Sequence, residues 1–278
     1  MPSSKSYATA TAFRRALEDR LQQIAKKEDA DLQRLRKQVP FDRLLVRLFA
    51  QEHPQWLLKG GYALELRIKD ARATRDIDLV LKNGDASILK TLQEIASINM
   101  KDFFMFVIGD SMMDLDAAPY GGSRYPVEAR MDGRIFAKFH LDLAIGDVII
   151  EPLETIKSRD WLKFAGIPPA SFPIISQEQH FAEKVHAYTV QRERPNSRVR
   201  DLVDMVLLIQ SDKMNKAKVK QALTATFNRR KTHALPKELK PPFEAWTEPF
   251  STLAEECGLD TNMSTAFELL DLYYSSLK

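Results

Sequence analysis

Two acidic side chains, Asp76 and Asp78, have the spacing in this chain that most directly indicates chemistry. They stand in the segment D-I-D-L-V-L, where the acids alternate with apolar residues as in a β-strand with one buried face. Both carboxylates therefore share one face of the predicted strand. Like charges at this spacing repel each other, so the pattern indicates a cation between them, although an Asp-x-Asp on a solvated strand is also common.

A glycine pair, Gly60-Gly61, interrupts an apolar run upstream of these acids. We expect a helix that leads into a tight turn here, because glycine lets backbone N–H groups approach an anion closely. A phosphate-binding turn combined with a divalent metal site is the arrangement that holds a nucleoside triphosphate.

A third carboxylate, Asp142, stands in a predicted β-hairpin. The strands Arg124–Met131 and Arg134–Ile145 flank Asp132-Gly133, a two-residue hairpin signal. Asp142 lies mid-strand in an apolar segment, where an isolated carboxylate is costly to desolvate. It either faces solvent on a surface hairpin or faces the earlier pair as a third ligand. Three converging carboxylates can hold Mg²⁺ while one accepts the proton of an attacking hydroxyl.

The later part of the chain carries a second set of charged residues. Asp201 and Asp204 are three residues apart in a predicted helix and so share one face. The residues alone indicate a salt bridge of these acids with Arg198, Arg200 or Lys184.

These segments resemble a known family. K-G-G-Y-A-L followed by R-A-T-R-D-I-D-L resembles the signature of the nucleotidyltransferase AbiEii/AbiGii toxin family, which belongs to the DNA polymerase β-type nucleotidyltransferase superfamily. That family supplies the toxins of type IV toxin–antitoxin pairs, including the MenT-like enzymes. H-L-D-L-A-I-G-D resembles the family element that contains Asp142, with Asp147 as a second, structural acid. One departure is Tyr62, which stands where the family usually has Ser or Thr after the glycines.

The resemblance implies a catalytic assignment for the first set of residues. Asp76, Asp78 and Asp142 would ligate Mg²⁺ or Mn²⁺. Gly60 and Gly61 would lie at the terminal phosphates of the nucleoside triphosphate, and Asp142 would draw the proton from the acceptor hydroxyl.

The resemblance also covers the later charged residues. E-K-V-H-A and R-V-R-D-L-V-D-M resemble the family's second pair of motifs. Lys184 would neutralise triphosphate charge, and Asp201 or Asp204 would orient the triphosphate or the base, with Asp201 matching the motif better. Arg75 would either stabilise the phosphates as well or pair with a carboxylate.

Composition limits the protein class. With 278 residues and 44% hydrophobic residues, the chain can fill one large core or two modest ones. The single Cys257 excludes an intrachain disulfide, and no apolar run reaches the roughly 20 residues that span a bilayer. We therefore expect a cytoplasmic protein without a membrane segment.

The predicted fold is α+β, with a mixed nucleotidyltransferase-type sheet flanked by helices and followed by a mostly helical C-terminal half. We expect a nucleotidyltransferase domain over residues 1–160 and a helical domain over 161–278 that carries Lys184 and Asp201/Asp204. The apolar periodicity predicts the following elements: a helix from Ala12 until Pro40 interrupts it, a second helix over Phe41–Gln51, a turn at Asn83-Gly84, a helix over Ala86–Ile98, a buried strand over Phe103–Ile108, an irregular connection over Glu151–Ile175, and a helix capped by Ser176 with Gln179 in the reciprocal position.

A basic segment, Lys213–Lys237, contains no Asp or Glu, although the whole chain has a net charge of only +3. Such a segment is either an electrostatic footprint for a phosphate backbone or a solvated helix face.

The predicted function is that of a toxin in a toxin–antitoxin pair. The enzyme would move a nucleoside monophosphate to an RNA acceptor, the tRNA 3′ end, and so block translation, with a cognate antitoxin as a further partner. The alternatives are transfer to a small molecule, as in antibiotic-modifying enzymes, and a non-catalytic relative that binds nucleotide or RNA.

Overall fold

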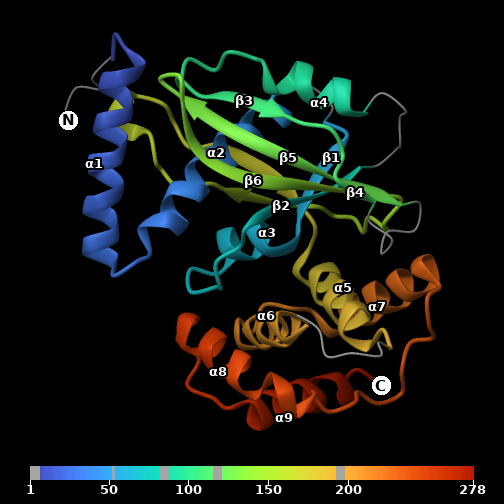
Figure 1. Cartoon of the computed structure of the whole chain (residues 1–278). Coiled ribbons are helices and arrows are strands. Elements are labelled where there is room, and N and C mark those ends of the chain that lie inside the picture. Colours follow the sequence, from blue (N-terminus) through green and yellow to red (C-terminus); the bar gives the residue numbers. More distant parts are fainter. Residues whose placement is uncertain (1–6, 52–53, 82–87, 115–120, 192–197) are drawn as a thin grey trace. The chain divides into compact units, whose positions relative to one another are not determined.

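The structure, a computed structural model, describes residues 7–51, 54–81, 88–114, 121–191 and 198–278 (Figure 1). It is α+β, with a mixed sheet and a largely helical later part, as predicted. The chain forms two compact units, each assembled from separate segments. The first unit consists of 1–58, 73–146 and 155–174, and the second of 59–72, 147–154 and 175–278. The division therefore differs from the single boundary expected at residue 160.

The sheet of the first unit has the strand order β3-β5-β6-β2-β1-β8-β7, and β4 pairs with β5. Strand β2 is parallel to β6 and β1 is parallel to β8, whereas β5 is antiparallel to both β6 and β3. The strands, shown as arrows in Figure 1, are β1 (Trp56–Lys59), β2 (Asp76–Leu81), β3 (Met105–Ile108), β4 (Met113–Asp114), β5 (Gly122–Met131), β6 (Arg134–Ile145), β7 (Glu154–Lys157) and β8 (Ser171–Ile174).

The predicted hairpin is confirmed as β5 and β6. Asp132 and Gly133 connect the strands with φ values of 57° and 68°. Two consecutive residues with positive φ form the type I′ turn that matches the twist of a hairpin. This turn sets β6 beside β5, and the pairing of β6 with β2 on its other side places Asp142 inside the sheet.

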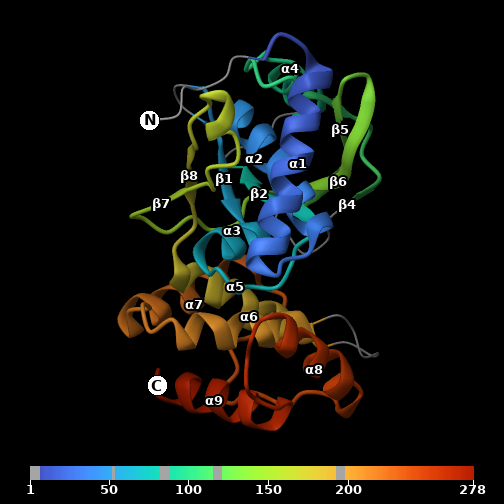
Figure 2. The ribbon, with the colours of Figure 1, turned by 90° about the vertical axis from the view of Figure 1, so that its left-hand side faces the viewer.

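The helices of the first unit are α1 (Ala10–Glu28), α2 (Leu32–Leu48) and α4 (Ile88–Ala96). Helix α1 contacts α2, and α2 contacts β6 (Figure 2). The predicted break at Pro40 is wrong, and Phe41–Gln51 is not a separate helix, because α2 runs through the proline. The break lies at Asp29, which has φ 50°, and α2 starts where the Asp31 carboxylate accepts a hydrogen bond from the Arg34 N–H.

Two further expectations for the first unit are corrected. Strand β3 is not buried, because Met105 and Val107 are 58% and 50% exposed while Ile108 faces inward, as expected at the end of the strand order. The segment Glu151–Ile175 is more than a connection, since it contributes β7, β8 and the 3₁₀ helix η1 (Lys163–Ala165). The predicted turn at Asn83-Gly84 lies outside the described residues.

The second unit is helical. Its elements are α3 (Gly60–Arg67), α5 (Gln177–Thr189), α6 (Val199–Gln210), α7 (Lys216–Arg230), the 3₁₀ helix η2 (Glu244–Trp246), α8 (Thr247–Glu256) and α9 (Met263–Ser275). Leu64 of α3 belongs to the same apolar core as Phe181 of α5 and Val203 of α6. None of the helices in the described part of the chain is long and apolar enough to cross a membrane.

The start of α5 follows the prediction in part. The Ser176 hydroxyl accepts a hydrogen bond from the Gln179 N–H, as an N-cap residue does. The reciprocal bond is absent among the contacts described, because the Gln179 side chain instead bonds the backbones of Val148 and Ile150. This side chain therefore ties α5 to the segment that follows β6.

Candidate active site

Strands β2 and β6 bring the three predicted metal ligands to one face of the sheet. In their parallel register, Asp78 pairs with Asp142 and Asp76 pairs with His140. Paired residues of adjacent strands point to the same side, as do residues two apart on one strand. Asp76, Asp78 and Asp142 therefore form one group, which we call the carboxylate face.

Arg124 on β5 contacts two acids of the carboxylate face. Its Nε and Nη2 donate to Oδ1 and Oδ2 of Asp142 at 2.7 and 2.6 Å, and Nη2 lies 3.6 Å from Oδ2 of Asp76. These contacts, with the hydrogen bond to Asp142 foremost, raise the pKa of Arg124. Nδ1 of His140 lies 3.0 Å from Oδ1 of Asp76. The guanidinium is thus the cation that these carboxylates share in the structure.

The carboxylate face suits a divalent cation in ligand type, because Mg²⁺ prefers carboxylate oxygens. Within the described ranges, however, no three acidic, histidine or cysteine side chains are gathered closely enough to hold a metal ion as they stand. The guanidinium of Arg124 lies against Asp142 and Asp76 instead. The donor set thus fits a divalent cation in chemical type, while Arg124 lies against two of its three acids.

Sequence reasoning did not identify Arg124 as part of this group. Counting back from the Asp132-Gly133 turn places Arg124 opposite Leu141. An irregularity between Ala129 and Arg130 shifts the pairing by one residue, so that Arg124 lies opposite Asp142. Because such a bulge has no clear sequence signal here, only the observed register reveals the ion pair.

A second group, which we call the Lys184 cluster, lies in the second unit and consists of Lys184, Asp201, Asp204, Arg72 and Arg198. Lys184 Nζ lies 2.8 Å from Asp201 Oδ1 and 2.7 Å from Asp204 Oδ2. Arg72 donates to both oxygens of Asp204, at 3.0 and 2.8 Å. Arg198 Nη1 lies 3.1 Å from Asp201 Oδ2. The salt-bridge interpretation thus holds for Lys184 and Arg198, and Arg72 is a partner that the sequence did not indicate.

Burial and charge oppose each other in the Lys184 cluster. Burial lowers the pKa of Lys184, but the carboxylates of Asp201 and Asp204 outweigh it and raise that pKa. Burial raises the pKa of Asp204, but Lys184 and Arg72 outweigh it and lower that pKa. Both groups are therefore charged at neutral pH. Asp204 is fully buried, whereas Asp201 keeps slight exposure.

The glycine pair stands at a different junction from the one predicted. A strand, β1, leads directly into helix α3, whereas we expected a helix leading into a turn. Gly60 has φ +65°, a conformation that glycine adopts without strain. The side chain of Tyr62 is buried, so the ring belongs to the interior of the unit.

The residue before the glycines joins a buried ionic group. Lys59 Nζ contacts Asp147 and lies 3.5 Å from Oε2 of Glu183. Arg230 donates to Asp147 at 3.0 and 3.1 Å, so this acid is held by two cations as a structural residue would be. Since Glu183 precedes Lys184 in α5, the Lys59–Glu183 contact ties the start of α3 to the helix that carries Lys184.

The remaining predicted residues are accounted for as follows. Arg75 is exposed and forms no ion pair with any residue that the structure describes. It belongs to the first unit with the carboxylate face, whereas Gly60, Gly61 and the Lys184 cluster belong to the second. In the basic segment, Lys213, Lys216, Lys218 and Lys220 are exposed, but Arg230 is used internally in the contact with Asp147.

Comparison with known proteins places the chain in a family. The model of the AbiEii nucleotidyl transferase toxin of type IV toxin–antitoxin systems matches residues 43–268, and the chain belongs to this family. It is thus a member of a nucleotidyltransferase toxin family, and membership implies an antitoxin partner. No curated protein gives a significant match.

One solved structure supports the fold, and a second gives a weaker match. The chain resembles MenT4, the nucleotidyltransferase toxin Rv2826c from Mycobacterium tuberculosis H37Rv, with a TM-score of 0.55 and 16% identity over 86% of this chain and 90% of that one. It also resembles JHP933 from Helicobacter pylori, with a TM-score of 0.46 and 17% identity over 89% of this chain and 97% of that one.

Proposed function

We propose that this protein is a Mg²⁺- or Mn²⁺-dependent nucleotidyltransferase that moves a nucleoside monophosphate from a nucleoside triphosphate to the 3′ end of tRNA. Such a modification blocks aminoacylation and hence translation in the cytoplasm. The observation that carries the proposal is the register of β2 and β6, which pairs Asp78 with Asp142 beside Asp76. Membership of a nucleotidyltransferase toxin family supports it.

The carboxylate face performs two tasks in this proposal. Asp76, Asp78 and Asp142 would hold the divalent cation, which would supply positive charge for the phosphates and for the leaving pyrophosphate. Asp142 accepts the proton of the acceptor hydroxyl, whose oxygen forms the new bond to the α-phosphate. Arg124 must release Asp142 for either task, because both carboxylate oxygens accept its hydrogen bonds in the structure.

The second unit supplies the phosphate-binding groups. The Lys184 cluster contains three cations and two carboxylates, so it keeps positive charge for a phosphate. Lys184 is the residue that stabilises the triphosphate, and Asp201 orients it. Asp204 is less suited to a nucleotide contact, because its buried carboxylate is enclosed by Arg72 and Lys184. Gly60 and Gly61 approach the terminal phosphates through the backbone, and Arg75 is available as a further cation.

The basic segment Lys213–Lys237 is the proposed RNA contact. Its exposed lysines at positions 213, 216, 218 and 220 can neutralise backbone phosphates. This positive surface does not suit a cationic antibiotic as the acceptor.

The test is a labelling reaction with total RNA and each α-labelled nucleoside triphosphate in turn. We expect labelled RNA with the parent protein and a loss of at least about a hundredfold with Asp78→Asn, because the ligand loses its charge. Glu128→Gln is the matched control, since Glu128 lies on β5 four residues beyond Arg124 and pairs with Arg130 and Lys138 rather than with an acid of the carboxylate face. This control should label RNA normally.

Each other outcome overturns part of the proposal. Equal labelling by the parent and Asp78→Asn would remove Asp78 from the metal site. Label on a small molecule and none on RNA would favour the antibiotic-modifying alternative. No labelling with any nucleotide, in the presence of RNA binding, would favour a non-catalytic relative.

A further inference from the structure

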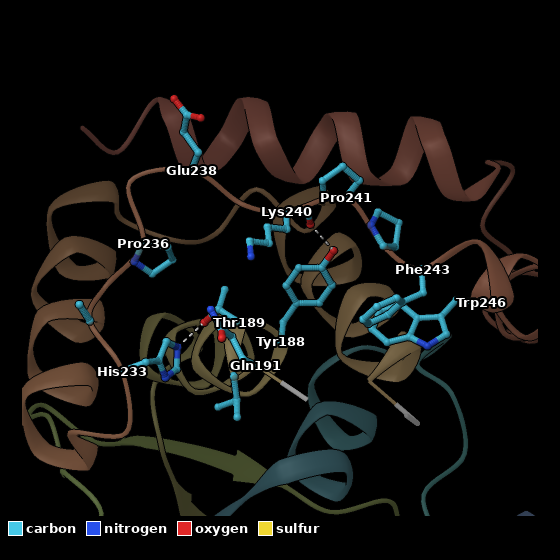
Figure 3. A pocket seen from close by; sticks show the side chains of 13 residues that line it. Tyr188, Thr189, Gln191, His233, Pro236, Glu238, Lys240, Pro241, Phe243 and Trp246 are labelled. Carbon is cyan, nitrogen blue, oxygen red and sulfur yellow. Dashed lines mark hydrogen bonds between the residues drawn. The ribbon is translucent and has the colours of Figure 1, made fainter. Parts of the chain in front are cut away.

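A pocket in the second unit lies between the end of α5 and the segment that leads to α8 (Figure 3). Its volume is about 580 Å³, within the range of roughly 300–1,000 Å³ typical of small-molecule sites. Figure 3 shows Phe243 and Trp246 on one side and Pro236 and His233 on the other, with Lys240 between them. None of these residues belongs to the carboxylate face or to the Lys184 cluster.

One wall of the pocket is aromatic and well supported. The ring centroids of Phe243 and Trp246 are 5.4 Å apart, and those of Tyr188 and Trp246 are 6.0 Å apart. The Tyr188 hydroxyl donates a hydrogen bond to the backbone carbonyl of Lys240 at 2.9 Å, which holds the Tyr188 ring in place. Trp246 is buried, whereas Phe243 is 47% exposed. A flat apolar ring is thus held in place with one surface open to a partner.

The polar groups of the pocket differ in their availability. Both ring nitrogens of His233 lie within hydrogen-bond distance of hydroxyls, those of Thr189 at 2.8 Å and Thr232 at 2.9 Å, so this side chain is already satisfied. Gln191 and Lys240, by contrast, make no side-chain hydrogen bond or ion pair with other residues in the described ranges. An amide and an ammonium are therefore available to a ligand. Glu238 points away from the pocket (Figure 3).

The basic segment ends at the pocket. The acid-free segment Lys213–Lys237 runs along α7 and directly into the pocket wall at His233 and Pro236. Beside the pocket, Lys231, Lys237 and Lys240 are exposed, together with Glu238. The three lysines suit a phosphate backbone, and the open ring of Phe243 suits a base, because every nucleobase has a face that can stack on an aromatic side chain.

We propose that this pocket binds an unpaired nucleobase of the RNA acceptor. The base stacks on Phe243, its edge meets the amide of Gln191, and a flanking phosphate meets Lys240. The inference rests on the proposed function, since it names a subsite for the acceptor of that reaction.

The test measures the binding of a single-stranded RNA of about twelve nucleotides by fluorescence anisotropy, without nucleoside triphosphate or divalent metal. A second probe of equal length has abasic positions, so that it keeps the phosphates but lacks bases to stack. We expect Phe243→Ala to weaken binding of the first probe at least about fivefold and to leave the second unchanged, because stacking on one aromatic ring is lost. Phe243→Trp should restore binding, since it keeps a ring for stacking.

The matched control is Leu272→Ala, which removes an apolar side chain that is 71% exposed on α9. It should bind both probes like the parent, and thermal melts should show that all variants are folded. Equal binding of the first probe by Phe243→Ala and the parent would overturn the inference, as would an equal loss for both probes. Binding of a proline-rich peptide in place of RNA would also overturn it and identify a protein partner.

The labelling reaction separates this inference from the proposed function. If the parent labels RNA and Phe243→Ala binds RNA normally, the base subsite is rejected and the proposed enzymatic reaction is retained. If Phe243→Ala binds RNA more weakly and the parent labels no RNA, the base subsite is retained and the proposed reaction is rejected.

Discussion

At the scale of single residues, Arg124 governs the charge on the carboxylate face. It forms a bidentate pair with Asp142 and also reaches Asp76. A divalent cation bound by the same oxygens would face this positive charge at close range. In the proposed reaction, Arg124 and a divalent cation would therefore compete for the acids of the site.

We predict that Arg124→Gln increases the affinity of the protein for Mn²⁺ in the absence of nucleotide. Because the side chain of Arg124 is 31% exposed, the ion pair is expected to contribute up to about 1 kcal/mol, which corresponds to a change of up to about fivefold in affinity. Free Mn²⁺ is measured by electron paramagnetic resonance. Arg130→Gln is the control, since Arg130 lies on the same strand but pairs with Glu128. Weaker Mn²⁺ binding by Arg124→Gln would mean that the arginine organises the carboxylates rather than competing for them.

The two aspartates of the Lys184 cluster differ in their burial and in their ion-pair partners. The side chain of Asp204 is fully buried and contacts two cations, Lys184 and Arg72. Asp201 contacts Arg198 through its Oδ2 atom, and the side chain of Arg198 is 32% exposed. Removing one member of a buried ion pair costs far more than removing a partly solvated one. We therefore assign a structural role to Asp204 and keep Asp201 for the ligand.

We predict that Asp204→Asn lowers the free energy of unfolding by about 3–5 kcal/mol and that Asp201→Asn lowers it by less. The measurement is urea denaturation at neutral pH. Since the folded pKa of Asp204 is lowered, its contribution is complete above the unfolded value of about 3.9 and is lost as the pH falls through the folded value. The difference between the parent and Asp204→Asn should therefore narrow below about pH 4. Equal losses of stability for the two variants would contradict the division of roles.

At the scale of elements, the hairpin of β5 and β6 assembles the carboxylate face. Its turn is a local feature, and the pairing of β6 with β2 carries Asp142 beside Asp78. The irregularity at Ala129/Arg130 then aligns Arg124 with Asp142. The turn, the bulge and the parallel register are all needed before the acids and the arginine meet.

We predict that Gly133→Ala destabilises the protein by about 1–2 kcal/mol, measured by urea denaturation. The cost is conformational, because Gly133 has φ +68° and an added Cβ would meet no atom within 4 Å. Gly133→Asn should cost less, since asparagine tolerates the left-handed conformation. Equal losses for the two variants would show that the backbone conformation is not the cause.

At the scale of the whole molecule, the two units are interleaved along the chain. The second unit takes residues 59–72 from within the N-terminal half, and Leu64 and Ala71 from this segment are buried in its core. The first unit takes β8 from beyond residue 160, where Ile174 pairs with Leu58 of β1. Dividing the chain at residue 160 would therefore separate residues that belong to the same core, in each of the two units.

We predict that a fragment of residues 1–160 does not fold by itself. It would expose Leu64 and Ala71 and would lack the partner strand of β1. The measurement is the dispersion of amide signals in a ¹H–¹⁵N spectrum, with the full chain as the reference. Well-dispersed signals from the fragment would show that residues 1–160 form an independent domain.

The sequence by itself determined the features that depend on neighbours along the chain. The alternation of Asp76–Leu81 predicted β2, and Asp132-Gly133 predicted the hairpin, because strand periodicity and turn chemistry act over a few residues. The motifs around Asp76 and Asp142 also indicated the family that the comparison with known proteins confirms.

Only the tertiary structure decided which distant side chains meet. Asp142 pairs with Arg124, and Asp204 pairs with Arg72 as well as with Lys184. Neither arginine follows from local patterns, since the first pair depends on a bulge and the second joins a loop to a helix. Pro40 lies inside α2, and the chain bends at Asp29, because packing of the helix outweighs local propensity. Long-range packing and register, which the periodicity of one strand or helix does not encode, therefore determine the geometry of the candidate site.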